Sequence, residues 1–164
     1  MGVGSTLYRT WLQYNETGEN GFRGMYRELL GRIVVAGESS GAFAAALREL
    51  ELGAKSMLGI NPEFMDAAPF SGSYLRIGTK TGGASSGDRA VSAWGKEEEA
   101  FSLKGFPTDG SIRLELTGSS SSGVLYGVFY LLRAIALGMN PKELEAEETP
   151  VNRLRMINQW DNAD

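Results

Sequence analysis

The most regular hydrophobic pattern in the chain follows a short run of serines, Ser119 to Ser122. Beyond it, apolar residues recur at spacings of four, three and four positions, the spacing of one face of an α-helix. These residues are Val124, Val128, Leu131 and Ile135. Serine hydroxyls accept hydrogen bonds from the free N–H groups of a first helical turn, so the run also predicts the N-cap. We therefore expect the main core helix over residues 124–137.

Glycines mark where this helix approaches its neighbours and where it ends. Gly123 and Gly127 lie four positions apart and leave a flat surface that a sheet or another helix can approach closely. Gly138 stands where a left-handed residue commonly ends a helix, and Pro141 follows. Arg133 interrupts the apolar run, which is too short to span a bilayer comfortably, so no membrane contact is expected.

Several shorter stretches predict the strands of a sheet. Every second residue of the stretch 112–116 is apolar, which is the pattern of a half-buried strand. The stretch 32–36 is rich in β-branched residues and predicts a buried central strand. Two more strands are expected at 74–78 and 101–104, and the turn residues of 106–110 predict a hairpin.

Two further helical segments and one ambiguous segment complete the pattern. A helix is expected over 41–52, capped by a serine just before it and stopped by Gly53. Residues 26–31 predict a helical turn. The glutamate-rich stretch 142–149 predicts either a solvated helix or a linker.

Composition excludes several classes of function. The chain has 164 residues, enough for one domain with a real core. Its net charge is −4 with no basic cluster, which argues against a nucleic-acid surface. There is no Cys and no His, so a Ser-His-Asp triad, a Cys-His pair and the common zinc motifs are excluded within these residues. No signal peptide is visible, which favours a cytoplasmic over a secreted protein.

Two motifs that suggest a cofactor or metal site lack the residues or the geometry that such a site requires. Gly82 to Gly87 have the glycine spacing of a phosphate loop, but Asp88 stands where the lysine is required and would repel phosphate. The run Glu97 to Glu99 is better explained as a charged lead-in to an edge strand, because consecutive residues of an extended chain do not converge on one point. We expect no cofactor and no metal site.

The last residues predict the beginning of a second domain. Pro150 breaks the glutamate-rich stretch, and 153–157 has the composition of a new strand that leads into an Asn/Trp/Asp cluster. We therefore divide the chain into an N-terminal α/β domain, residues 1–150, and a linker with a first strand, residues 151–164.

Two motifs carry a resemblance to a known family. Residues 123–133 and 155–162 resemble the N-terminal region of α-glucuronidases of glycoside hydrolase family 67. The resemblance implies an α+β fold, a two-layer α/β sandwich in which helices pack on one face of a mixed sheet. In the family this domain precedes a (β/α)8 barrel, and the enzyme removes glucuronic acid or its 4-O-methyl ether from xylo-oligosaccharides with inversion. The family's catalytic carboxylates lie on the barrel, beyond Asp164, so no catalytic residue is assigned in this chain.

The same resemblance suggests which residues meet substrate. Trp160 corresponds to a tryptophan that contacts the uronic acid, and an indole ring suits sugar C–H faces and a methyl ether. Asn158, Asp161 and Asn162 would help to shape the site. Alternatively, Trp160 packs between the two domains. Gln159 and Ala163 depart from the His and Leu of many members, which leaves the shape of the pocket open.

The implied partners are a glucuronic-acid-substituted xylo-oligosaccharide, the protein's own C-terminal barrel, and a second copy of the full-length enzyme in a homodimer. Two other functions stay open. One is the matching domain of a hexosaminidase-like glycosidase, whose helix motif is similar. The other is a stand-alone carbohydrate-binding or interaction module, which would bind sugar without a barrel.

Overall fold

The structure is a computed structural model that describes residues 14–18, 21–37, 41–80 and 99–150. Its strands are β1 (Arg32–Ala36), β2 (Glu63–Met65), β3 (Tyr74–Thr79), β4 (Phe101–Thr108), β5 (Ser111–Gly118) and β6 (Glu145–Glu148). Its helices are α2 (Arg23–Gly31), α3 (Gly41–Gly53), the π-helical turn η1 (Ala54–Leu58) and α4 (Ser121–Ala136). The predicted serine cap at 39–40, the glycine-rich stretch 82–87 and the predicted strand 153–157 lie outside the described residues.

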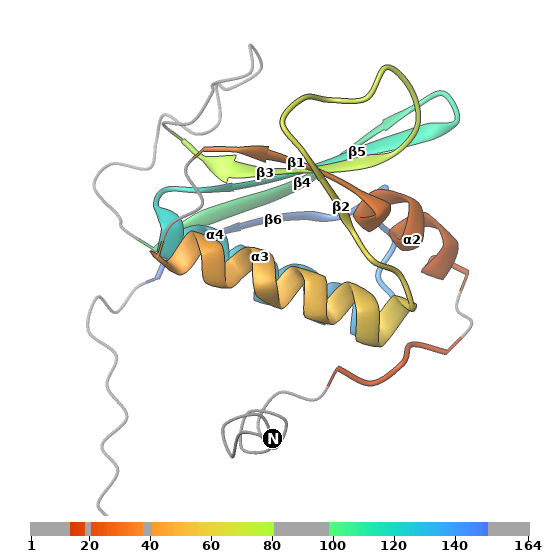
Figure 1. The fold of residues 1–164 in the computed structure, drawn as a ribbon, viewed down its shortest axis with the longest axis horizontal. Helices are drawn as coiled ribbons and strands as arrows, with labels where there is room; N and C mark the ends of the chain where they lie inside the picture. The colour runs from red at the N-terminus through yellow and green to blue at the C-terminus, as the bar shows by residue number, and fades with distance from the viewer. Residues whose placement is uncertain (1–13, 19–20, 38–40, 81–98, 151–164) are drawn as a thin grey trace, which may run out of the picture.

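The strands form one mixed sheet in the order β2-β1-β3-β5-β4-β6. Strands β2, β1, β3 and β5 run parallel to one another, whereas β4 is antiparallel to both β5 and β6. Helices α3 and α4 lie together against one face of the sheet, and α2 lies at its end (Figure 1). The expected α+β architecture, with helices packed on a mixed sheet, is confirmed.

The core lies between the sheet and helices α3 and α4. In β5 every second side chain is buried, as the period of two predicted. The register places Leu114 beside Leu75 of β3, and Leu75 beside Ile33 of β1, so three apolar side chains form one row on the helix-facing side. The four apolar residues that predicted the core helix, Val124, Val128, Leu131 and Ile135, are each at most 1% exposed. This apolar contact between layers is the main stabilising interaction of the domain.

The first turn of α4 packs directly on the sheet, as the glycines predicted. Ser120 caps the helix, since its Oγ accepts from the N–H of Gly123 at 3.3 Å. A Cβ on Gly123 would overlap the carbonyl oxygen of Ala100, just before β4. A Cβ on Gly127 would press on the side chain of Leu116 in β5. Gly138 has φ +64°, which confirms the predicted left-handed end of this helix.

Gly53 does not stop α3, contrary to the prediction. Its φ of −62° and ψ of −47° are helical, and the chain continues into η1 and ends at Gly59, which has φ +69°. A Cβ on Gly53 would overlap the side chain of Leu132 in α4. The glycine therefore serves close packing between the two helices, and the left-handed stop lies six residues later.

The glutamate-rich stretch contains a strand, so the prediction of a solvated helix or a linker was wrong. Residues 145–148 form β6, which pairs with β4 and makes β4 an internal strand rather than an edge. Lys104 of β4 and Glu145 of β6 form an ion pair at 2.6 Å. Charged side chains suit an edge strand because they discourage further strand pairing.

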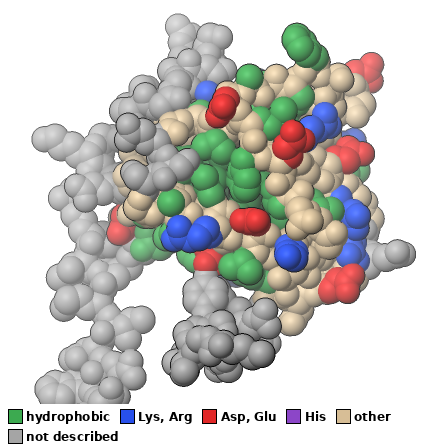
Figure 2. Space-filling model, viewed as in Figure 1, with side chains coloured by type: hydrophobic (Ala, Val, Ile, Leu, Met, Phe, Trp, Pro, Cys, Tyr) green, Lys and Arg blue, Asp and Glu red, His purple; other side chains and the backbone are tan. Residues whose placement is uncertain are grey.

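Smaller differences concern element ends. The predicted helical turn at 26–31 is the last part of a longer helix, α2, which begins at Arg23. The predicted 106–110 hairpin is confirmed, but β4 extends to Thr108, so the turn is confined to Asp109 and Gly110. No helix in the described part of the chain is long and apolar enough to cross a membrane. Figure 2 shows acidic and basic side chains interspersed around a central hydrophobic group on the face that carries β1 and α3.

Candidate functional site

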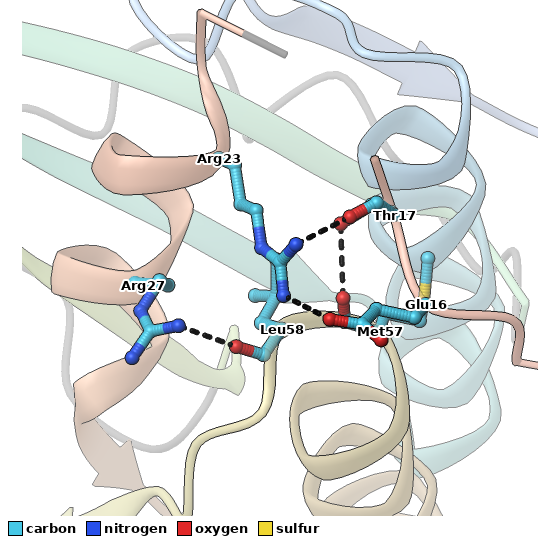
Figure 3. Close-up of polar contacts among 6 residues, drawn as sticks. All are labelled: Glu16, Thr17, Arg23, Arg27, Met57 and Leu58. Atoms are coloured by element: carbon cyan, nitrogen blue, oxygen red, sulfur yellow. Dashed lines mark hydrogen bonds and ion pairs between the residues drawn. The ribbon is translucent and has the colours of Figure 1, made fainter. Parts of the chain in front are cut away.

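A short segment at the N-terminal end of the described chain, residues 14–18, is fastened across η1. The N–H and the Oγ of Thr17 both donate to the carbonyl oxygen of Met57, at 3.0 and 2.9 Å. Arg27 of α2 donates to the carbonyl of Leu58 at 3.0 Å (Figure 3). Carbonyl groups at a helix end have no partner within the helix, so these donors satisfy the end of η1.

Arg23 holds the same segment from the other side. Its Nη1 donates to the carbonyl of Thr17 at 2.6 Å, and its Nη2 forms an ion pair with Glu16 at 2.9 Å (Figure 3). The Arg23 side chain is 17% exposed and that of Glu16 is 74% exposed, so the guanidinium is anchored while the carboxylate faces solvent. The segment is thereby positioned over the ends of α2 and η1.

A buried carboxyl group forms the third attachment. The hydroxyl of Tyr14 donates to Oε2 of Glu49 in α3 at 2.9 Å, and Glu49 is only 8% exposed. Burial raises the pKa of the Glu49 carboxyl and also the pKa of the Tyr14 hydroxyl, because both charged forms lose hydration. The Tyr14 hydrogen bond offsets part of this burial cost, because a hydroxyl that donates to a carboxylate stabilises its charged form.

These attachments create a hollow of about 720 Å³ between residues 14–18, η1 and α4. Its apolar lining comes from Met57, Phe129 and Leu132, and its polar lining includes Glu16 and Arg133. Hollows that hold small ligands or large side chains have volumes of about 300–1,000 Å³. We call this the first hollow.

A second hollow of about 290 Å³ lies on the other side of α4, towards β4 and β6. Tyr130 packs against Phe101 with ring centroids 5.6 Å apart and forms part of its lining. Phe129 and Arg133 line both hollows, so the two lie side by side along one surface of the helix. We define the α4 outer face as Tyr126, Phe129, Tyr130, Arg133 and Ala136.

A separate charged group lies on the sheet surface that faces away from α3 and α4. The Arg113 guanidinium lies 4.6 Å from the centre of the Phe106 ring, and its Nε lies 3.3 Å from Oε1 of Glu115. The neighbouring β4–β6 pair carries the ion pair between Lys104 and Glu145. These charges are matched within the sheet, so this surface offers no concentrated charge of one sign.

The arrangement of the α4 outer face suits binding. Among them, no three His, Cys, Asp or Glu side chains gather in a way that could hold a metal ion. The α4 outer face combines three aromatic rings with one guanidinium, groups that are enriched where proteins make contacts. Sequence reasoning noted Arg133 only as an interruption of the apolar run. The spacing of the aromatic residues at 126, 129 and 130, followed by Arg133, was the available signal for an exposed face.

The substrate-contact residues expected from the sequence are not placed by the structure. Trp160, Asn158, Asp161 and Asn162 all lie outside the described residues, so their assignment stays a prediction. The described chain ends at Pro150, which lines the second hollow.

Comparison with known proteins identifies the family. Residues 10–131, well over half of the chain, match the model of the glycosyl hydrolase family 67 N-terminus. The chain belongs to this family. It is therefore a glycoside hydrolase N-terminal domain, and the suspected relationship is confirmed. No curated protein matches the sequence.

Two solved structures are similar to parts of this family 67 N-terminal domain. One is a family GH115 4-O-methyl-α-glucuronidase described as specific for decorated arabinogalactans, with a TM-score of 0.51 and 21% identity. The match covers 63% of this chain and 13% of that one. Another is a family GH138 enzyme targeting the pectin rhamnogalacturonan II, with a TM-score of 0.49, 14% identity, and coverage of 73% and 12%. The chain thus spans about an eighth of the length of either protein.

Proposed function

We propose that this chain is the non-catalytic N-terminal domain of an α-glucuronidase that removes glucuronic acid or its 4-O-methyl ether from xylo-oligosaccharides. The match of residues 10–131 to the family 67 N-terminus carries the proposal. The GH115 structure is named as a 4-O-methyl-α-glucuronidase as well, but at 21% identity it supports the fold alone.

The chemistry would belong to a catalytic domain that follows this one. Inverting hydrolysis needs a carboxylic acid that protonates the leaving oxygen and a carboxylate that activates water from the opposite side of the sugar. In the proposal these groups stand beyond Asp164. Two of the described glutamates have structural contacts, since Glu16 pairs with Arg23 and Glu49 binds Tyr14. This domain would support the catalytic domain and help to shape the entrance to its site.

Release of the uronic acid tests the proposal. The longer protein encoded by the gene and the 164-residue chain are each incubated with a xylo-oligosaccharide that carries a terminal 4-O-methylglucuronic acid. We expect release by the longer protein and none above a buffer blank by the 164-residue chain. A decorated arabinogalactan serves as the comparison substrate. Preferential release from the arabinogalactan, or no release from either substrate, contradicts the proposal.

Trp160 is proposed as the substrate contact in that protein, with Asn158, Asp161 and Asn162 shaping the site. Trp160→Ala in the longer protein removes the stacking surface, and a lost aromatic contact of this kind is expected to lower kcat/KM by about tenfold. Equal kcat/KM values for Trp160→Ala and the parent protein would show that this tryptophan only packs between domains.

A further inference from the structure

The described chain leaves the domain at the α4 outer face. After β6, Thr149 and Pro150 line the second hollow together with Tyr130 and Phe129. Pro150, the last described residue, therefore lies beside these rings. An extended chain advances about 3.3 Å per residue, and the α4 outer face from Tyr126 to Arg133 is about 10 Å long. The start of a following domain is thus within a few residues of the whole surface.

The α4 outer face is built like one side of an interface. Tyr126 is 38% exposed although it stands on the core helix of the domain, and Leu137, one turn beyond Arg133, is 66% exposed. Aromatic residues and arginine are the usual anchors of protein interfaces, and they are most effective around pockets that exclude water. Here two pockets flank a shared phenylalanine and arginine.

The remaining surfaces near the exit of the chain are less suitable. The free edge of β6 carries Glu145, Glu147 and Glu148, and charges on an edge strand oppose close docking. On the far side of the sheet, Arg113 is already paired with Glu115. Arg133, in contrast, lies between the two hollows and is exposed.

We propose that the α4 outer face is the docking surface for the domain that follows Pro150. This inference rests on the proposed function, which supplies that domain, and it specifies which face of the N-terminal domain contacts it. The matching surface presents apolar side chains to the two hollows and a carboxylate or carbonyl oxygen to Arg133. Docking buries the rings of Tyr126 and Phe129 and covers the second hollow.

A thiol placed on this face reports docking directly, since the 164 residues contain no Cys. Ala136→Cys puts the thiol at an exposed position that lines the first hollow. Asp109→Cys is the control, at the exposed turn between β4 and β5. The rate of maleimide modification is measured for both variants in the 164-residue chain and in the longer protein, against each parent without an added thiol.

We expect the two thiols to react equally fast in the 164-residue chain. In the longer protein the thiol at 136 should react at least about tenfold more slowly, while the thiol at 109 keeps its rate, because a buried site reacts only through local opening. Circular dichroism of each variant confirms that the small changes leave the fold intact.

Three results overturn the inference. The first is an unchanged rate at 136 in the longer protein. The second is protection at 136 already in the 164-residue chain, which would mean that another segment of this chain covers the hollow. The third is protection that grows with protein concentration, which would identify a second copy as the occupant. The proposed function is tested separately, by the release of uronic acid. A gene that encodes no domain after Asp164 would contradict both the proposed function and the docking surface.

Discussion

The close approach of α4 to the sheet predicts opposite effects for one substitution at two glycines. Gly123 and Gly24 both stand in the first turn of a helix, α4 and α2 respectively. A Cβ on Gly123 would overlap the backbone carbonyl of Ala100, whereas a Cβ on Gly24 would meet nothing within 4 Å. Alanine should therefore destabilise the protein at position 123 and stabilise it at position 24.

The size of the effect follows from the atoms involved. In a helix, Ala is favoured over Gly by about 1 kcal/mol, and this gain applies at both positions. Overpacking costs about 1–3 kcal/mol, and the upper part of this range applies at Gly123 because a backbone carbonyl cannot rotate away. The same Ala100 carbonyl accepts the Ser119 N–H at 2.8 Å, so moving α4 also strains this bond and the Ser120 cap, which is worth about 1 kcal/mol.

Gly123→Ala should thus lower the free energy of unfolding by about 2 kcal/mol, which for a chain of this size corresponds to a melting temperature lower by about 4–8 °C. Gly24→Ala should raise the free energy of unfolding by about 0.5–1 kcal/mol. Urea titrations followed by far-UV circular dichroism measure both. If Gly123→Ala unfolds at the same urea concentration as the parent, or at a higher one, the close contact between α4 and the start of β4 is not present in solution.

Two further predictions concern Glu49 and Gly59. Burial raises the pKa of Glu49 above its ordinary value of 4.5, so its contribution to stability is fully present below pH 4.5 and is lost as the pH rises through the folded-state value. The amide oxygen of Glu49→Gln still accepts from Tyr14 but does not titrate. The free energy of unfolding of this variant, measured in urea, should therefore rise relative to that of the parent between pH 4 and pH 7. A difference that does not change with pH contradicts this prediction. Gly59 has φ +69°, so Gly59→Ala should cost about 1–2 kcal/mol in thermal unfolding and Gly59→Asn clearly less; equal losses would argue against the left-handed end of η1.

The elements that sequence reasoning predicted correctly are those whose burial is set locally. The strand expected at 32–36 has the same bounds in the structure, and the stripe from Val124 to Ile135 is buried throughout. A period of two or 3.6 residues records which side of an element faces the core, and it can be recognised without knowing the partner. The family was predicted correctly for a different reason. That prediction depended on short motifs such as residues 123–133 rather than on periodicity.

The elements that were wrong are those decided by a distant partner. Residues 145–148 contain three glutamates and one alanine and have no strand propensity of their own. They form β6 because β4 presents an unpaired edge, and Lys104 then meets Glu145. Gly53 likewise resembles a helix stop by sequence, but its role depends on Leu132, nearly eighty positions away. Tertiary contact overrides local preference at both sites.

The first hollow shows the same limit at the candidate site. Its walls come from residues 14–18, from η1 and from α4, and no local pattern brings these three together. Thr17 donates to the carbonyl of Met57, forty positions away, so the segment is placed by a long-range contact, and the shorter-range bond from Arg23 to Thr17 reinforces it. The sequence offered the aromatic residues of α4 but not the side of the helix on which a cavity would form.

The apolar character of α4 itself argues that its outer face is covered in the working protein. The sequence predicted the main core helix here, and a helix that is hydrophobic on nearly every side is normally enclosed. The domain leaves Tyr126 and Leu137 substantially exposed, although it buries Val124, Val128, Leu131, Leu132, Ala134 and Ile135. Exposed groups of this kind favour association. This domain buries one side of α4. The proposed docking of a following domain on the α4 outer face would bury the other side.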